Sequence, residues 1–426
     1  MRPRVLLCFV PVVAAGVGIW AGRALPLGSP AQAAPSVDSC TTCHQSLTGK
    51  LAAPAEGMTE DVHGRAELRC AGCHGGDPAR SGMDAHDLSA GFAGVPDRRQ
   101  IPRQCARCHE DPGLMRRFNP SLPTDQFARY LTSEHGKRLA AGDRNVAVCT
   151  SCHGVHPVRA VSDSRSPVFP TNVPATCARC HADAALMKPY GIPTSQFAEY
   201  RESVHGQALL RRGNRQAPAC NDCHGNHGAV PPGVESVANV CAQCHRATRD
   251  LFVRSPHKKA FDTLGIAECT VCHGTHDIAF PTDVMLGQEQ GSVCLQCHPA
   301  GTPGLRAAVE MRGTLEEVKA AIAQAEAVLK LAAGAGMDVG DARIDLDEAT
   351  SQLIRARAVT HSVNLLDVGR VAAAGLTAAG RARAVGEAAL AEVGFRRRGL
   401  GVSVAVIAFV AVLLWLKLHE LKRTSQ

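Results

Sequence analysis

Aromatic residues are scarce in this chain, which has 426 residues of which only 4% are Phe, Trp or Tyr. Glycine and proline are frequent by comparison, with 40 and 25 copies. A conventional hydrophobic core depends on large apolar side chains, and residues 34–303 have few of them. This part of the chain therefore needs another source of buried apolar mass.

The chain also has almost no cysteine to spare for disulfides. Of its 19 cysteines, 18 fall in Cys-x-x-Cys-His motifs, and the one left over is Cys8, in the N-terminal apolar run. This excludes a structural disulfide scaffold. Zinc ribbons also use Cys-x-x-Cys pairs, but they need no histidine in the fifth place.

Nine copies of the motif are present, and the pattern is typical of covalent c-type haem attachment. The two thiols add to the haem vinyl groups, and the histidine that follows can bind the iron. The motif cysteines are Cys40, Cys43, Cys70, Cys73, Cys105, Cys108, Cys149, Cys152, Cys177, Cys180, Cys220, Cys223, Cys241, Cys244, Cys269, Cys272, Cys294 and Cys297. The motif histidines are His44, His74, His109, His153, His181, His224, His245, His273 and His298.

Nine porphyrins would supply the missing apolar mass of residues 34–303. Buried apolar surface contributes roughly 25 cal/mol per Å², so each haem replaces several large side chains. We therefore expect folding to require the cofactor. The formal charge of +7 does not indicate nucleic-acid binding, because the propionates of nine haems would make the loaded protein acidic.

The N-terminal 33 residues resemble an export signal. Arg2 and Arg4 precede an apolar run over residues 5–21, and Ala31-Gln32-Ala33 is a small-x-small cleavage site. The mature chain is then expected to start at residue 34. The alternative is an uncleaved N-terminal anchor.

A second apolar segment, residues 399–418, is predicted to cross a membrane as one helix, with residues 419–426 as a cytoplasmic tail. It has nearly the ~20 residues that a span requires, and Trp415 lies near one end. The flanking positive charge is nearly balanced, so orientation follows from chemistry: haem is attached in an exporting compartment. We expect a bacterial inner-membrane protein with its motif region in the periplasm. A buried amphipathic helix is the alternative, but the segment has no polar face.

The motif region, residues 34–303, is a set of duplicated two-motif units. Each unit has a motif, a solitary histidine and a second motif, and two units share a Gln-Phe-x-x-Tyr sequence before the solitary histidine. The apolar spacing predicts short helices that carry this histidine at the C-terminal end and are stopped by Gly136 and Gly206. Residues 304–398 are rich in alanine and predict an antiparallel helical hairpin, interrupted at Gly334–Gly340, whose second arm leads to the membrane.

Ten histidines lie outside the motifs, and nine of them are candidate second ligands of iron. His419, beyond the predicted span, is the exception. The nine candidates are His63, His86, His135, His156, His205, His227, His257, His276 and His361. Nine irons would then each bind two imidazoles and have no open position. For each candidate, and above all His86 and His361, the alternative is a structural polar residue. Met115 and Met187 recur after motifs and could pack against haem or ligate it.

Three of these candidates follow their own motif as Cys-His-Gly-x-His: His156, His227 and His276. A chain of three residues cannot pass around a porphyrin to its opposite face. Each of these histidines must therefore bind the iron of a different haem, if it binds one. Such cross-ligation would hold neighbouring haems close together.

These doubled motifs, with the Ser-x-His-Gly segments at His135 and His205, resemble the multihaem c-type cytochromes over roughly residues 38–300. The resemblance implies low-spin haem and electron relay in respiratory chains. The expected fold is mainly α with much irregular structure, packed around haem, followed by the helical hairpin and one transmembrane helix.

Three functions are compatible with this pattern. The favoured one is a membrane-anchored electron carrier between the quinone pool, or a membrane complex, and periplasmic redox proteins. A second is a reductase or dehydrogenase of a small nitrogen or sulfur compound, which would need one haem with an open position. A third is a quinol dehydrogenase subunit that uses the ninth haem. An electron carrier rather than an enzyme is the main expectation.

Overall fold

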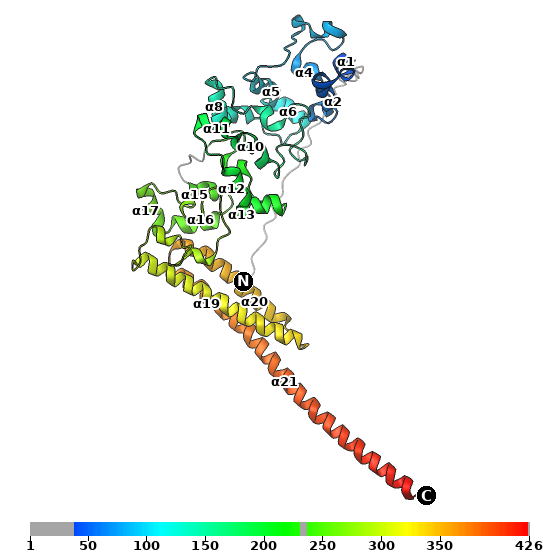
Figure 1. Cartoon of the computed structure of the whole chain (residues 1–426), viewed down its shortest axis with the longest axis vertical. Helices are drawn as coiled ribbons and strands as arrows, with labels where there is room; N and C mark the ends of the chain where they lie inside the picture. The colour runs from blue at the N-terminus through cyan, green and yellow to red at the C-terminus, as the bar shows by residue number, and fades with distance from the viewer. Residues whose placement is uncertain (1–37, 231–236, 425–426) are drawn as a thin grey trace, which may run out of the picture. The chain divides into compact units, whose positions relative to one another are not determined.

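The computed structural model describes residues 38–230 and 237–424, and within them every regular element is a helix (Figure 1). The mainly α fold with one long apolar helix at the C-terminal end is confirmed. The predicted signal peptide, residues 1–33, lies outside the described residues.

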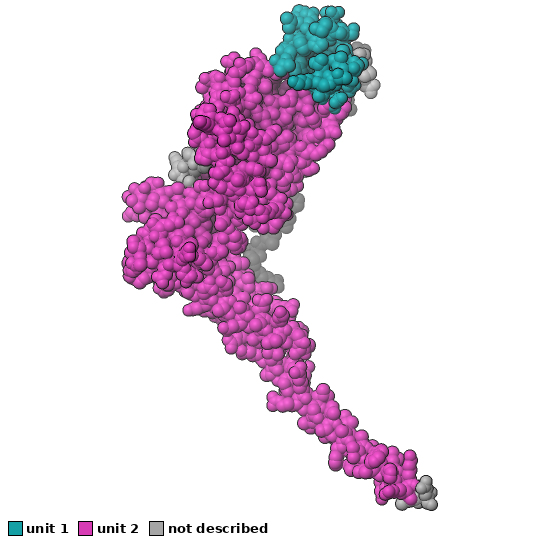
Figure 2. Space-filling model, in the orientation of Figure 1, with its two compact units in different colours: residues 1–56, 68–95 teal, residues 57–67, 96–426 magenta. Residues whose placement is uncertain are grey.

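The chain divides into two compact units, which are described separately (Figure 2). The first comprises the described residues 38–56 and 68–95, and the second comprises residues 57–67 and the chain from residue 96 onward. The first unit contains α1 (Ser39–Gln45), η1 (Gly49–Leu51), α2 (Ala53–Gly57), whose last residue belongs to the second unit, α4 (Cys70–His74), η2 (Gly82–His86) and η3 (Leu88–Ala90). 

The second unit holds the remaining seven motifs and the C-terminal helices. Up to the fourth motif its helices are α3 (Val62–Arg65), α5 (Ile101–His109), α6 (Pro112–Phe118), α7 (Gln126–Thr132), α8 (Glu134–Ala140) and α9 (Cys149–His153). Up to the sixth motif they are α10 (Val173–His181), α11 (Ala184–Met187), η4 (Lys188–Tyr190), α12 (Gln196–Glu202), α13 (Val204–Gly206), η5 (Gln207–Arg211) and α14 (Cys220–His224). Up to the ninth motif they are α15 (Val237–Cys241), α16 (Arg246–Val253), α17 (Pro256–Leu264), α18 (Thr270–His273), η6 (Asp283–Met285) and η7 (Cys294–Gln296).

Most motifs form a single helical turn. Six lie entirely within helices, namely α1, α4, α5, α9, α10 and α14. Positions i, i+3 and i+4 share one face of a helix, so this conformation presents both thiols and the histidine on the same side. In the doubled motifs a glycine in the positive-φ region ends the turn, as at Gly154 (φ 81°) and Gly225 (φ 79°).

The sequence predicted that each solitary histidine lies at the C-terminal end of a Gln-Phe-x-x-Tyr helix. This prediction was wrong, because each of these histidines lies in the helix that follows. Helix α7 stops at Thr132, Ser133 caps the next helix, and His135 lies in the first turn of α8. Gly136 is helical and stops nothing. A β-carbon there would lie 2.0 Å from the Tyr130 carbonyl oxygen, so the glycine is required where the two helices meet at a corner.

A tyrosine fixes each of these corners to the second motif of its unit. The Tyr130 hydroxyl donates a hydrogen bond of 2.9 Å to the carbonyl of Ala147, two residues before the motif cysteine Cys149. The Tyr200 hydroxyl does the same to Pro218, two residues before Cys220, at 2.7 Å. The repeated tyrosine therefore sets the position of the second motif relative to the solitary histidine.

The C-terminal region is a three-helix bundle made of α19 (Pro303–Gly334), α20 (Gly340–Val359) and the first part of α21 (Leu365–Thr424), with η8 (Thr360–Ser362) before α21. Helix α21 packs along both other helices (Figure 1). Its core is built largely from alanine, which lets the helices approach closely: Ala325, Ala332, Ala349, Ala356, Ala372, Ala378, Ala379 and Ala382 are buried.

The bundle differs from the predicted hairpin in one respect. The interruption between Gly334 and Gly340 is present, but the second arm ends at Val359 and does not itself lead toward the membrane. The third helix, α21, does so instead. With 60 residues at 1.5 Å each it is about 90 Å long, and its exposed, apolar part has the length and composition of a membrane span.

Ion pairs attach the bundle to the motif region, and among the described residues they include Arg312 with Glu289 at 3.1 Å and Arg357 with Asp283. Arg357 of α20 donates two hydrogen bonds to the Asp283 carboxylate of η6, from Nε at 2.8 Å and from Nη2 at 2.7 Å. The Asp283 side chain is only 8% exposed, and Lys319 Nζ lies 3.9 Å from its Oδ2. The hydrogen bonds from Arg357 are the main reason that the pKa of Asp283 is lowered from its ordinary value.

We predict that Arg357→Ala destabilises the loaded protein by about 1 kcal/mol, because the nearly buried Asp283 carboxylate loses its two charge-assisted hydrogen bonds. The urea midpoint measures this loss, with the exposed neighbour Arg355→Ala as the matched control. Since the folded-state pKa of Asp283 is depressed, the effect is present at pH 7 and disappears as the pH falls through that lowered pKa. Equal midpoints for the two variants at pH 7 would contradict the prediction.

Candidate functional site

Histidine side chains face one another in pairs throughout the motif region. Eight pairs have ring centroids between 5.9 and 6.2 Å apart, and each joins one motif histidine to one candidate second histidine. The pairs are His44 with His86, His109 with His63, His181 with His135, His153 with His227, His245 with His205, His224 with His276, His298 with His257, and His273 with His361.

This separation is the one that two imidazoles on opposite sides of a single metal require. An imidazole nitrogen binds a transition metal at about 2 Å and lies about 1.1 Å from its ring centre, so the two centroids stand about 6.2 Å apart. The eight pairs match this spacing closely. It leaves room for one metal ion between the two ring nitrogens.

Hydrogen bonds orient several of these rings. The Nδ1 atoms of His44, His74 and His361 lie 2.9, 2.8 and 2.9 Å from the backbone carbonyl oxygens of Leu51, Gly94 and Ala358. A carbonyl oxygen can only accept, so Nδ1 carries the proton and Nε2 is left as the free lone pair. This is the tautomer that a metal-binding histidine needs.

Burial keeps these imidazoles in the neutral form that binds metal. Desolvation is the main cause that lowers the pKa of ten of them from the ordinary value. They are His109, His135, His153, His181, His205, His227, His257, His273, His276 and His361.

The solitary histidines face the following repeat rather than their own. His135 lies between the third and fourth motifs but faces His181 of the fifth. His205 lies between the fifth and sixth motifs but faces His245 of the seventh. The two other solitary histidines follow the same rule. A histidine from one repeat thus completes the first pair of the next repeat.

The doubled-motif histidines face in the opposite direction along the chain. His227, which follows the sixth motif, faces His153 of the fourth. His276, which follows the eighth, faces His224 of the sixth. Neither faces its own motif histidine, in agreement with the short reach of three residues. These rings are nearly parallel, with interplanar angles of 9° and 10°, whereas the pairs formed by solitary histidines are tilted by 34° to 86°.

A backbone hydrogen bond holds the two kinds of second histidine side by side. The residue before His135 donates its N–H to the carbonyl of Ala229, two residues after His227, at 3.0 Å. The same bond joins Val204, before His205, to Ile278, two residues after His276, at 2.8 Å. We call two segments joined by such a bond a clasp. Each of these two clasps holds two second histidines side by side, and the two histidines face motif histidines of two different motifs.

The ends of the repeat series use other histidines. His44 of the first motif has no preceding repeat to supply a partner, and the local His86 faces it. His273 of the eighth motif has no following doubled motif, and His361 of η8 faces it at 6.0 Å with an interplanar angle of 18°. The C-terminal bundle therefore places a histidine where another repeat would have supplied one.

The eight pairs account for all but two of the 18 histidines named from the sequence. The two that remain are His74 and His156, one motif histidine and one candidate second histidine, so the count of nine and nine still balances. Met115 and Met187 are buried on α6 and α11.

Cysteines of successive motifs also lie together. The thiols of the first cysteines lie close enough in three motif pairs to shift each other's pKa: Cys105 with Cys149, Cys177 with Cys220, and Cys241 with Cys269. The second cysteines of the even-numbered motifs then approach the following motif, Cys152 near Cys177, Cys223 near Cys241, and Cys272 near Cys294. The third to ninth motifs thus form one continuous series.

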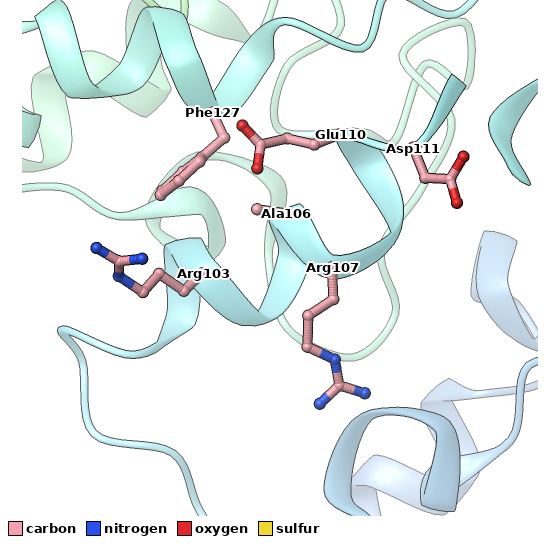
Figure 3. Close-up of a pocket in the computed structure, with 6 residues that line it drawn as sticks. All are labelled: Arg103, Ala106, Arg107, Glu110, Asp111 and Phe127. Carbon is pink, nitrogen blue, oxygen red and sulfur yellow. The ribbon is translucent and has the colours of Figure 1, made fainter. Parts of the chain in front are cut away.

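A hollow of about 350 Å³ lies beside the third motif (Figure 3). Its lining residues are Arg103, Ala106, Arg107, Glu110, Asp111 and Phe127. Both signs of charge are present and none of the six is a histidine. Ala106 and Arg107 are the two middle residues of the third motif, so the hollow adjoins the site of His109, but it contains no member of the facing histidine pairs.

The donor set fits haem better than zinc. Among residues 38–230 and 237–424, no three His, Cys, Asp or Glu side chains are grouped as ligands of one ion. A structural zinc site needs four protein ligands. Iron in a porphyrin already has four nitrogen ligands and needs only two more, which is what each facing pair provides.

Comparison with known families agrees with this donor set. A family model of cytochrome c3 matches residues 212–299, and a family model of cytochrome c7 and related cytochrome c matches residues 30–110. In these two regions the chain has the sequence of a multihaem c-type cytochrome. The matches contain four and three of the motifs, and they imply covalently bound c-type haem. No curated protein and no solved structure matches the chain.

Several positioning residues were not anticipated from the motifs alone. The tyrosines at 130 and 200 and the helix-capping serines at 133 and 203 occur at equivalent places in two repeats, and this recurrence was the available signal. Asp61 occupies the capping position in the first repeat and gave no such signal, because its neighbours diverge.

We predict that His361→Ala converts one haem, that of the eighth motif, from low to high spin, because its iron loses one of two imidazole ligands. Electron paramagnetic resonance of the oxidised protein measures the change as one haem in nine. The matched control is His419→Ala, since that ring packs beside Trp415 and faces no motif histidine among the described residues. An unchanged spectrum in the His361 variant would remove it from the ligand set.

Proposed function

We propose that this chain is a membrane-anchored cytochrome that holds nine c-type haems, each between two histidines, and relays electrons in the bacterial periplasm. Haem iron supplies the redox chemistry by alternating between its ferric and ferrous forms. The proposal assigns the 18 motif cysteines to covalent attachment. It assigns the nine motif histidines and the nine candidate second histidines, 16 of which form the eight facing pairs, to the nine irons.

The facing histidine pairs carry this proposal. A pair of imidazoles at 5.9–6.2 Å would hold one haem iron between two ring nitrogens, and such an iron would have no position left for a substrate. Iron of this kind exchanges electrons without binding a reactant. The arrangement therefore favours a carrier over a reductase or dehydrogenase of a small nitrogen or sulfur compound.

Contacts between motif cysteines support relay along the chain. Each cysteine sulfur would join the vinyl edge of its haem, so neighbouring sulfurs bring neighbouring haem edges together. The thiol of Cys105 lies near that of Cys149, and Cys152 lies near Cys177. Electron tunnelling falls steeply with distance, and short edge separations of this kind support rapid transfer from motif to motif.

The exposed part of α21 supports the anchor. Its apolar side chains from Leu400 to Leu421 surround the helix, and the apolar window is not buried against any other described residue. Exposure of this apolar surface to water is unfavourable in free energy, whereas the hydrocarbon core of a bilayer solvates it. We infer an inner-membrane span with the motif region in the periplasm. The partners would be the quinone pool or a membrane complex on one side and periplasmic redox proteins on the other.

We predict that the purified protein contains nine covalent haems, all low-spin in the ferric state. Mass spectrometry counts the haem increments, and electron paramagnetic resonance reports the spin state. One stoichiometric high-spin haem would instead favour the enzyme function, since an open iron position could bind a substrate. A mass without nine increments would contradict the proposal as a whole.

We predict that a chain ending after Arg398 is soluble and keeps the full haem spectrum, because the buried residues of the bundle all precede this point. Cell fractionation and an absorption spectrum measure both properties. A matched control that ends after Leu421 keeps the whole span and should stay with the membrane. Retention of the shorter chain in the membrane fraction would contradict anchoring by α21.

A further inference from the structure

A third clasp joins the N–H of Val62, before His63, to the carbonyl of Val158, two residues after His156, at 2.9 Å, and it differs from the other two by a buried carboxylate. Asp61 caps helix α3 two residues before His63 and is 1% exposed. In the three other repeats the equivalent capping residue is a buried serine, at Ser133, Ser203 and Ser255. The first clasp therefore has a buried carboxylate at the capping position, where its counterparts have a hydroxyl.

The Asp61 carboxylate faces two of the candidate second histidines, His63 and His156. Its Oδ1 lies 3.0 Å from Nδ1 of His63, and its Oδ2 lies 4.0 Å from Nδ1 of His156. The carboxylate accepts two backbone hydrogen bonds as well, from the N–H of His63 at 2.8 Å and that of Val158 at 2.6 Å. Within the described residues, no lysine or arginine forms an ion pair with it. Amide and imidazole N–H groups thus supply its hydrogen bonds.

Other second or motif histidines have neutral groups in the place of this carboxylate. The Nδ1 atoms of His44 and His361 face backbone carbonyl oxygens. The Ser133 hydroxyl donates to the Tyr130 carbonyl and accepts from the Gly136 N–H. Glu199 approaches His276 at 3.9 Å, but its side chain is 39% exposed and solvent screens its charge. Asp61 combines burial, full charge and a direct hydrogen bond to the ring.

We propose that Asp61 is a positioning residue that lowers the reduction potential of the haem bound by His63 and His109. A carboxylate that accepts the Nδ1 proton increases the electron donation of Nε2 to iron. Ferric haem with two neutral imidazoles carries one more positive charge than ferrous haem, and a buried anion stabilises that extra charge. Both effects favour the oxidised form. The same charge would act, more weakly, through His156.

This inference rests on the proposed haem ligation, and the test separates the two. Redox titration of the haem-loaded Asp61→Ser protein, which keeps a capping hydroxyl, should show one ninth of the amplitude moved to higher potential. We expect at least a tenfold change in the ratio of oxidised to reduced haem, about 59 mV for one electron. Asp61→Asn should give the same direction. The control is Ser133→Ala, which removes a cap without changing charge and should leave the titration unchanged.

The outcomes are distinct. Nine low-spin haems with an unchanged titration in Asp61→Ser would overturn the inference and leave the proposed function standing. An unsubstituted protein without nine haems would overturn the proposed function. Should both Asp61 variants fail to load haem, Ser133→Asp provides the converse test. It should lower the potential of the haem at His135 and His181, and a loaded variant with no such shift would contradict the inference.

Discussion

Two imidazoles on one iron must approach it from opposite faces of the porphyrin, and a histidine close in sequence to its own motif cannot do so. The repeats meet this constraint by exchanging histidines. The clasps at His135 and His205 each hold one histidine that faces forward to the next repeat and one, His227 or His276, that faces back to the previous repeat. Under the proposed ligation every exchanged histidine bridges two repeats, and the cofactors become part of the framework that joins them.

An exchange of this kind leaves one motif histidine at each end of the series without a neighbouring repeat to supply its second histidine. At the N-terminal end, His86 replaces the missing forward-facing histidine. At the C-terminal end, η8 of the bundle brings His361 to His273, and the Arg357–Asp283 ion pair fixes α20 to the same region. The bundle thus has two consequences, completion of the eighth pair and continuation of the chain into the apolar part of α21.

The sequence predicts much of this arrangement, because the motifs and the histidine count are chemical requirements that leave a clear pattern. The mainly α class and the histidines that come together followed from it. The partner of each histidine did not, because exchange between repeats depends on backbone bonds such as Val204 to Ile278 that have no side-chain signature. The role of Gly136 was also hidden: a helix-stopping glycine and one required by close approach to Tyr130 are identical in sequence.

The most direct test of the account is an experimental structure of the haem-loaded protein at a resolution that identifies the axial ligands of each iron. The account predicts that Nε2 of His135 and Nε2 of His181 bind the same iron, across two repeats. Binding of His135 to the haem of the third or fourth motif, within its own repeat, would contradict the exchange on which the proposed relay is built.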